Sequence, residues 1–575
     1  MAFQMSPGVS VTEKDISLIV PAVASTGGGI VSPFQWGPAK IPVLVGTQKE
    51  MATMFGAPVN SAYAAAFWFC AANFLSYGNN LKVVRFITAS DLNACSGTIP
   101  SQIANLDEYA DPAASTAGAW IARYPGVMGN TLKVVVLDSL NTTLDNTDTV
   151  ADESEYSDYI KNFDGIPGTS AWAAAKGYSS AKDEIHILVI DEDGLLTGVR
   201  GTILERYQYL SKAKDSQKED GSTNYFKNVI NEQSEYVYWG HVDGLSYGSG
   251  TAWGANIEET AFKVLTAAKS VKSLTGGADT TFSASNDSAI AGYYSTYFGD
   301  PETIDVSFFI AGPLGASAAS TVIDVAASRK DCMAFVSPIT LISSTPYVNL
   351  TTALTYRSTL TASSYGVMDS GYKFQYDKYY DIYRYVPLCG DIAGCCVRTD
   401  IDRDPWYSPA GYERGRILNA IKLAYNPSKT HRDELYKKGI NPVVQFDGSG
   451  IILFGDKTLL QKPSAFDRIN VRRLFIVLEK AIATASKFLL FEFNDEFTRS
   501  QFKLLVEPFL RSVQSRRGIQ DFKVVCDETN NTAQVIDSNN FVADIYIKPN
   551  RSINFIQLNF IATATGISFE EVVGA

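Results

Sequence analysis

One segment of the chain, residues 450–458, has glycines and a lysine at nearly the spacing of a phosphate-binding loop. Its sequence, GIILFGDKT, departs from GxxxxGK[ST] by an Asp inserted before the Lys. A phosphate loop needs a flexible turn whose backbone N–H groups surround the phosphate. Here the loop positions are Ile, Ile, Leu and Phe, which are typical of a strand, and Asp456 would repel phosphate. We therefore interpret the segment as a strand followed by a hairpin turn at Gly455 and Asp456.

A second segment has the alternating carboxylates that open a calcium loop, at Asp400, Asp402 and Asp404. Such a loop requires glycine at its sixth position and a bidentate Glu at its twelfth. This chain has Pro405 and Gly411 there. The sequence favours a loop whose Asp and Arg residues pair structurally, with a fortuitous ion site as the alternative.

The other side chains that could bind a metal or act as nucleophiles are scattered. None of the three histidines, His186, His241 and His431, belongs to a zinc-ligand motif, and His186 lies in the apolar run IHILVI, which predicts a core or edge position. Adjacent Cys395 and Cys396 cannot form a CxxC site and are predicted to be buried. We therefore predict no catalytic, metal or cofactor-binding residue, and a protein that is not an enzyme.

The composition describes an ordinary globular chain of several domains. Its 575 residues predict three or four domains, and the net charge of −12 argues against a nucleic-acid coat. The seven cysteines are dispersed and odd in number, which fits a reducing compartment. The N-terminus lacks the features of a signal peptide, and no apolar run approaches the length of a membrane span.

The elements that would position any functional residue are clearest at residues 466–560. Apolar residues recur every three or four positions from Val471 to Leu489, which predicts a helix of about five turns. Asn494 or Asp495 offers a cap for a second helix, in which Pro508 predicts a kink or a restart. Three strands are expected to follow, at residues 522–526, 541–548 and 553–563.

Residues 41–87 show a strand, helix, strand pattern that predicts a βαβ-type unit with parallel pairing. The first strand of this unit is the run IPVLVG, which is predicted to be buried. The same texture returns at residues 304–311, with a helix at 317–329. Between them, residues 88–300 are polar and rich in loops, with strands expected at 132–137 and 185–190. The sequence therefore predicts an α+β domain inserted into a middle α/β domain.

Two further stretches concern the chain ends and a joint. Gly27, Gly28 and Gly29 follow Ser-Thr and predict a flexible hinge. Near the N-terminus, an alternating strand has no local partner. Near the C-terminus, apolar residues alternate with polar ones, and such a strand is an aggregation hazard unless it is paired. The strand residues in question are Val9, Val11, Ile556, Leu558, Phe560 and Ala562.

The predicted C-terminal helices are basic within an acidic chain. Residues 466–517 contain ten Lys or Arg and six Asp or Glu, a net charge of +4. This bias fits either a solvated face with internal ion pairs or a surface that binds an acidic partner. Nucleic acid is the weaker choice, because no aromatic residues interleave as a stacking platform.

Nine motifs in order along the chain carry a family resemblance. They are SPGVSVTE from Ser6, FQWGP from Phe34, FLSYGNNLKVVR from Phe74, ARYPGVMGN from Ala122, FFIAGP from Phe308, YKFQYDKYYDIYRYVPLCGDIAG from Tyr372, WYSPAGYERGRI from Trp406, FDRINVRRLF from Phe466 and LNFIATATG from Leu558. With these motifs the chain resembles the contractile tail sheath proteins of myophages, the large T-even-like contractile-tailed bacteriophages. The motifs largely miss residues 140–300.

The resemblance implies an α/β and α+β multidomain fold. An inner, tube-facing α+β domain would comprise residues 1–20 plus 427–575, a middle α/β domain 21–87 plus 301–426, and an outer inserted α+β domain 88–300. The strands at the two chain ends would be linking arms that complete the sheets of neighbouring subunits. Of the basic residues, Arg472, Arg473 and Lys480 would face the tube.

The resemblance also implies a mechanical role in the virion. Subunits assembled in the host cytoplasm would polymerise helically, as stacked hexameric rings, around the tail tube and contract to drive it through the host envelope. Expected partners are further copies of the chain, the tail tube protein, and baseplate and tail-terminator proteins, with no cofactor, no direct nucleic-acid contact and no membrane insertion. The alternative is a surface hydrolase or carbohydrate-binding adhesin with its site in residues 88–300.

Overall fold

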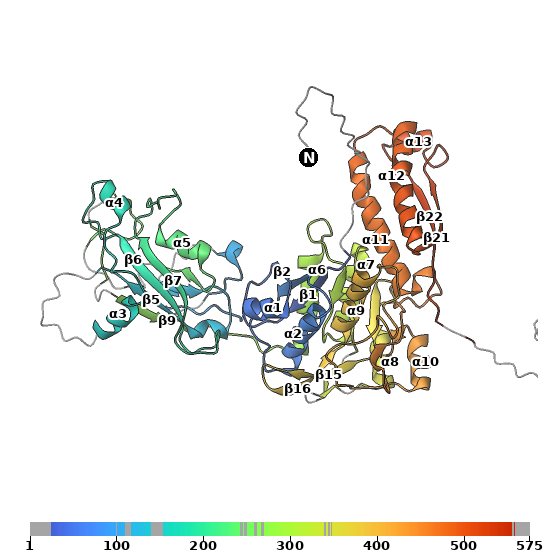
Figure 1. Cartoon of the computed structure of the whole chain (residues 1–575), viewed down its shortest axis with the longest axis horizontal. Helices are drawn as coiled ribbons and strands as arrows, with labels where there is room; N and C mark the ends of the chain where they lie inside the picture. The colour runs from blue at the N-terminus through green and yellow to red at the C-terminus, as the bar shows by residue number, and fades with distance from the viewer. Residues whose placement is uncertain are drawn as a thin grey trace, which may run out of the picture. The chain divides into compact units, whose positions relative to one another are not determined.

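The computed structural model describes residues 25–98, 101–109, 117–139, 153–241, 245, 250–257, 261–265, 269–338, 341–342, 345–346, 348–554 and 557. They form two compact units (Figure 1). The larger unit comprises Ala24–Asp402 and Pro409–Asp467, and the smaller comprises Arg403–Ser408 and the chain from Arg468 onward. The coarse prediction of a mixed α/β chain with several sheets is confirmed.

A seven-stranded sheet organises the larger unit. Its strand order is β18-β14-β11-β10-β1-β3-β2, and every neighbouring pair is parallel except β2 with β3. These strands are β1 (Gly28–Ser32), β2 (Pro42–Val45), β3 (Leu81–Arg85), β10 (Phe308–Ile310), β11 (Met333–Val336), β14 (Gly366–Asp369) and β18 (Ile440–Asn441).

Helices cover both faces of this sheet. Successive residues of a strand face opposite sides. The α-carbon hydrogens of Gly28 point at Phe74 of α2, whereas those of Gly29 point at Phe298 of α6, so α2 and α6 lie on opposite faces. The helices of this region are α1 (Gln48–Phe55), α2 (Ala62–Leu75), α6 (Asp287–Phe298), α7 (Ala316–Arg329), α8 (Leu350–Thr359), α9 (Cys389–Asp402) and α10 (Lys429–Lys437).

The predicted hinge at the glycine run is wrong for Gly28 and Gly29. Both lie in β1, which is buried and pairs with β10 on one side and β3 on the other. A side chain at Gly28 would meet the Phe74 ring at 2.7 Å. Gly28 is therefore needed for the close approach of α2 to the sheet, and Gly29 for the close approach of Val306 and Phe298 on the other face. Gly27 directly precedes the strand.

The predicted βαβ unit has the right elements but the wrong pairing. The run IPVLVG does form β2, yet β2 is an antiparallel edge strand with Leu44 exposed. The parallel neighbour of β3 is β1, which the sequence pattern did not indicate. The helix α2 and the strand β3 are confirmed close to their predicted positions.

A second sheet, antiparallel and in the order β7-β6-β5-β9, lies within residues 88–300. The predicted strands at 132–137 and 185–190 are its two central strands. Its elements, with a separate two-stranded pair β4–β8, are β4 (Trp120–Ala122), β5 (Leu132–Leu137), α3 (Glu153–Ile160), α4 (Ala171–Ala175), β6 (Glu184–Asp191), β7 (Thr202–Ser211), α5 (Phe226–Gln233), β8 (Val237–Trp239) and β9 (Lys269–Ser273).

Two predicted domain boundaries do not coincide with the packing. The helix α6, within the predicted outer domain, packs in the core of the seven-stranded sheet. The strand β18 pairs with β14, although it lies beyond the predicted boundary at residue 427. Further small elements of the larger unit are β12 (Leu341–Ile342), β13 (Thr345–Pro346), β15 (Tyr372–Asp377), β16 (Ile382–Pro387), β17 (Lys422–Leu423), β19 (Val443–Phe446) and β20 (Gly450–Leu453).

The smaller unit packs two long helices and a β-hairpin around one core. Asp495 caps the second helix by accepting the Thr498 N–H at 2.8 Å, as predicted, and this helix continues through Pro508 without a restart. Trp406 packs in the same core beside Leu474 and Val513. The elements are α11 (Ile469–Ser486), α12 (Glu496–Ser515), β21 (Ile519–Val525), α13 (Ala533–Asp537) and β22 (Asp544–Pro549).

Candidate assembly surface

The hairpin of β21 and β22 is a two-stranded sheet within the described part of the smaller unit. Ile545 and Ile547 of β22 pack against the core together with Phe522 of β21, whereas Tyr546 points to solvent. This alternation confirms the predicted strands at 522–526 and 541–548, which begin and end a few residues from their observed positions. Backbone groups on an outer strand edge can pair with a further strand. Among the described residues neither β21 nor β22 pairs with a third strand, so the outer edges of the hairpin can accept additional strands.

The predicted linking arms would supply such strands, but their residues lie outside the described part of the chain. This applies to the N-terminal residues Val9 and Val11. It also applies to the C-terminal residues Ile556, Leu558, Phe560 and Ala562. Their role stays a prediction.

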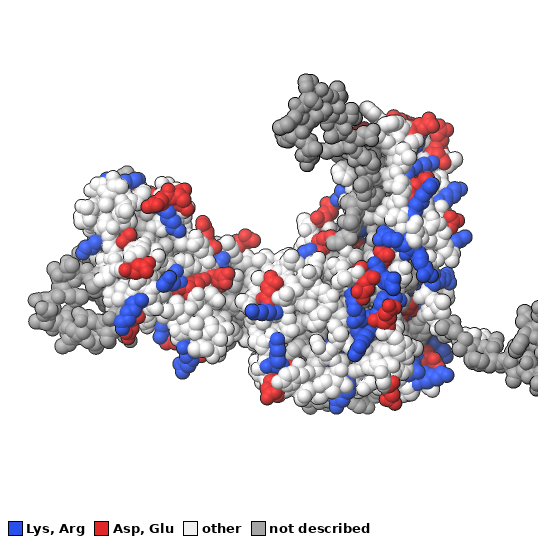
Figure 2. Space-filling view, in the orientation of Figure 1, with Lys and Arg blue, Asp and Glu red and all other residues white. Residues whose placement is uncertain are grey.

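The three predicted tube-facing residues all lie on α11 but differ in exposure. Arg472 and Arg473 are buried, whereas Lys480 is half-buried. The prediction assumed that Arg472 and Arg473 are exposed surface charges, but both are buried in this chain. In Figure 2, basic side chains of the smaller unit lie among acidic ones rather than in an unbroken basic stripe. The tube-facing assignment itself stays a prediction.

The sequence pattern did not predict the exposed aromatic segment at the link between α11 and α12. The apolar spacing placed Phe488 and Leu489 on the buried face of a continuing helix. The helix instead ends at Ser486, and Phe488 is exposed. The signal that could have identified this surface is the sequence FLLFEFNDEF, in which four phenylalanines fall within ten residues.

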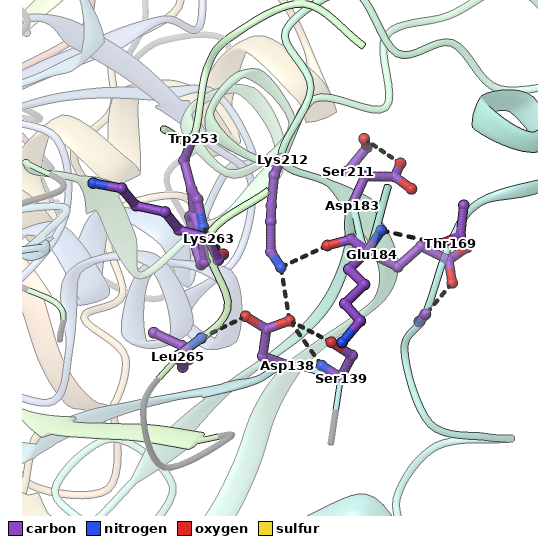
Figure 3. Close-up of polar contacts among 12 residues, drawn as sticks. Asp138, Ser139, Thr169, Asp183, Glu184, Ser211, Lys212, Trp253, Lys263 and Leu265 are labelled. Atoms are coloured by element: carbon purple, nitrogen blue, oxygen red, sulfur yellow. Dashed lines mark hydrogen bonds and ion pairs between the residues drawn. The ribbon is translucent and has the colours of Figure 1, made fainter. Parts of the chain in front are cut away.

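A buried ion pair between Lys212 and Asp138 lies in the antiparallel-sheet region (Figure 3). Lys212 Nζ lies 2.7 Å from Asp138 Oδ1 and donates to the Lys182 carbonyl at 2.8 Å. Asp138 also accepts the N–H groups of Ser139 at 2.7 Å and Leu265 at 3.0 Å. Burial raises the pKa of Asp138 and lowers the pKa of Lys212. Both side chains are fully enclosed and hydrogen-bonded, so the pair holds strand ends together rather than binding a substrate.

A second enclosed pair lies beside the seven-stranded sheet. Lys373 Nζ is 2.9 Å from Asp391 Oδ1, which also accepts the Tyr77 hydroxyl at 3.0 Å. Burial raises the pKa of Asp391. Neither Lys373 nor Asp391 reaches solvent, so this pair is also structural.

The segment that resembles a phosphate loop contains a strand, as predicted, but the hairpin turn does not lie at the predicted position. Residues 450–453 form β20, which pairs with β19, and the hairpin turn falls at residues 447–449. The predicted turn at Gly455 and Asp456 is therefore wrong. Asp456 is buried and accepts the Tyr436 hydroxyl at 3.2 Å.

Only part of the segment that resembles a calcium loop lies in a loop. Asp400 and Asp402 belong to α9, so the loop interpretation is wrong for them. Asp404 pairs with Arg516 at 2.7 Å, which confirms the predicted structural pairing at that position. Among the described residues, no group of three His, Cys, Asp or Glu is arranged to hold a metal ion.

The predicted interior positions of one histidine and two cysteines are confirmed. His186 lies on β6, stacks on Phe163, and accepts the Tyr209 N–H through Nδ1 at 2.9 Å. Burial lowers the pKa of His186. Cys395 and Cys396 are buried in α9. Within the described residues, no helix has the length and apolar character needed to span a bilayer.

Comparison with protein-family models identifies two regions of this chain. The phage tail sheath protein central domain matches residues 303–459, and the phage tail sheath C-terminal domain matches residues 461–563.

Comparison with characterised proteins extends the similarity to nearly the whole chain. The tail sheath protein of Vibrio phage KVP40 is 35% identical over 697 residues, covering 99% of this chain and 100% of that protein. The tail sheath protein of Enterobacteria phage T4 is 32% identical over 666 residues, covering 99% of each. In fold, the chain is similar to the crystal structure of a sheath tail protein from Listeria innocua, with a TM-score of 0.51 at 10% identity over 92% of this chain and 96% of that one.

Proposed function

Because this chain belongs to the phage tail sheath protein family, we propose that it is the sheath subunit that polymerises helically around the tail tube and contracts to drive the tube through the host envelope. The observation that carries this proposal is similarity to tail sheath proteins from one end of the chain to the other. The relatives give no support to a surface hydrolase or an adhesin. The role is mechanical and non-enzymatic, with energy stored in contacts between subunits and released cooperatively.

The outer edges of the β21–β22 hairpin, which pair with no further strand in the described part of the chain, support strand exchange as the link between subunits. An arm containing Val9 and Val11, and one containing Ile556, Leu558, Phe560 and Ala562, add strands to hairpins of neighbouring copies. Main-chain hydrogen bonds give such a link strength, and alternate side chains set its register. The hairpin is already packed on the helices of the smaller unit, and added strands would extend its sheet.

The domain arrangement follows from this linkage. The smaller unit, from Arg468 onward, is the inner domain next to the tube, together with the chain ends. The seven-stranded sheet forms the middle domain, and the region of the antiparallel sheet β7-β6-β5-β9 forms the outer domain. With β18 and α6 included in the middle domain, its limits differ from those given by the sequence pattern.

The partners are further copies of the chain, the tail tube protein, and the baseplate and tail-terminator proteins at the ends of the sheath. Lys480, which is half-buried whereas Arg472 and Arg473 are buried, is the best placed of the three basic residues for an acidic tube surface. Assembly takes place in the host cytoplasm, and the seven buried free cysteines suit a reducing compartment.

Arm truncation tests this mechanism. Deleting residues 1–15, or everything after Asn554, should leave soluble subunits that no longer polymerise, because the hairpin edges of neighbouring copies then lack added strands. Sedimentation velocity measures the assembly, and circular dichroism checks that the fold is retained. Contractile polymers of normal appearance from either truncated chain would disprove the linkage.

A further inference from the structure

The link between α11 and α12 displays an unusually exposed set of apolar side chains. We define this aromatic tip as five residues and their exposed fractions: Phe488 70%, Leu490 61%, Phe491 105%, Phe493 84% and Phe497 68%. Monomeric soluble proteins rarely expose a contiguous apolar patch larger than a few hundred Å². The tip is therefore a candidate interface rather than ordinary surface.

The size of the tip fits a stable contact. A phenylalanine ring provides about 150–250 Å² of surface. At the observed exposures, the four phenylalanines present on the order of 500–800 Å². One partner of a standard interface contributes about 800 Å². The tip alone thus supplies most of one side of a standard protein–protein interface.

The backbone of the tip is held in place before any partner binds. Asn494 donates to the Asn540 carbonyl at 2.8 Å and accepts Arg499 Nη1 at 3.0 Å, and Asp495 caps α12. Phe491 has a φ of +72°, a conformation that aromatic residues rarely adopt. Such backbone strain persists where the surrounding structure imposes it, often at binding sites. An anchored segment loses little entropy on binding.

We propose that the aromatic tip docks on a second copy of this chain within the sheath. This inference rests on the proposed function, in which each subunit touches both the tube and other subunits. In the proposed function the contracting sheath drives the tube forward, so the tube moves relative to the subunits around it and an apolar contact of standard size on the tube would have to break. A contact between copies can be kept. The contact is heterologous, as a helical polymer requires, so the tip meets a different surface of the next copy.

Photo-crosslinking identifies the occupant directly. The variant Phe491→p-benzoylphenylalanine carries a photoreactive side chain. Sheath assembled from it on purified tail tubes is irradiated. The expected product is a covalent dimer with twice the mass of the chain. A product joining the chain to the tube protein, or no product in fully assembled sheath, would overturn the inference.

A double substitution measures the contribution of the tip. Phe491→Ser with Phe493→Ser should raise the concentration needed for polymer formation at least tenfold while leaving the thermal melt unchanged, because both rings are exposed. Leu195→Ser with Val199→Ser is the matched control, since these residues are 55% and 64% exposed on the β6–β7 connection, and it should assemble normally. Wild-type assembly by the double variant would disprove this inference alone. Failure of the unaltered chain to polymerise would remove the proposed function as well.

Discussion

Replacing Asp369 by asparagine is expected to stabilise the protein above neutral pH. Asp369 ends β14 and is buried, and this burial raises its pKa to about 8. Its Oδ1 accepts the Gly371 N–H at 2.8 Å, and its Oδ2 lies 2.5 Å from Ser337 Oγ. An asparagine keeps the Gly371 contact through its Oδ1, and its Nδ2 donates to Ser337 Oγ in place of the hydrogen bond that Asp369 accepts from Ser337. The substitution therefore removes a buried charge without removing a hydrogen bond.

The magnitude follows from linkage. The unfolded carboxyl group has a pKa of about 3.9, so between about pH 4 and pH 8 the folded protein holds a proton that the unfolded chain has released. Stability contributed by this group therefore falls as pH rises through that window and is constant above it. At about 1.36 kcal/mol per pKa unit, the window of about four units corresponds to a loss on the order of 5 kcal/mol. The Asp369→Asn variant has no such loss, because its amide does not titrate.

The assay is urea unfolding of the unaltered chain and Asp369→Asn at a series of pH values. The stability difference should be near zero at about pH 4 and reach several kcal/mol in favour of Asp369→Asn at about pH 8. Asp324→Asn, which replaces an exposed carboxyl group on α7, is the matched control for the exchange of Asp for Asn. A difference for Asp369→Asn that does not change with pH, or a less stable variant at pH 8, would refute the reasoning.

Two further substitutions test the packing. Gly28→Val should lose about 1–3 kcal/mol of unfolding free energy, because the new side chain meets the Phe74 ring. Gly292→Ala is the control and should not destabilise the protein, because the space around Gly292 is open. Equal stability of the two variants would contradict the role of Gly28 in β1. Lys212→Met should lose about 3–5 kcal/mol by leaving Asp138 buried without its partner. Adding Asp138→Asn removes the buried charge and keeps an amide oxygen for the Ser139 N–H, so it should recover part of that loss in thermal melts of the single and double variants. A double variant no more stable than Lys212→Met would argue against the ion pair as the source of the loss.

The regular elements were predictable where local signals agree. Helix α2 has a dense apolar run, α11 has three/four spacing, and α12 has a capping aspartate at Asp495. Such signals depend on residues near one another in sequence. The metal and phosphate resemblances could also be rejected locally, because single positions such as Pro405 and Asp456 break their chemistry.

The errors arose where distant packing decides. Gly28 and Gly29 have the composition of a joint, yet they form a central strand because Phe74 and Val306 leave no room for side chains. The apolar run of β2 predicts burial, but whether a strand lies at the centre or the edge of a sheet depends on which strands pair with it.

The aromatic tip shows a different limit. Periodicity identifies apolar residues such as Phe488 but not whether the covering surface belongs to the same chain or to another copy. The helix ends at Ser486, and Phe488, which continues the pattern, is exposed. An apolar run that outlasts its helix is therefore a signal for an assembly surface.

Electron microscopy of the purified chain, with and without purified tail tubes, tests the central claim most directly. A sheath subunit should form hollow helical polymers that enclose the tubes and convert between a long, narrow state and a short, wide one. Discrete monomers under all conditions, with no association with tubes, would contradict the account.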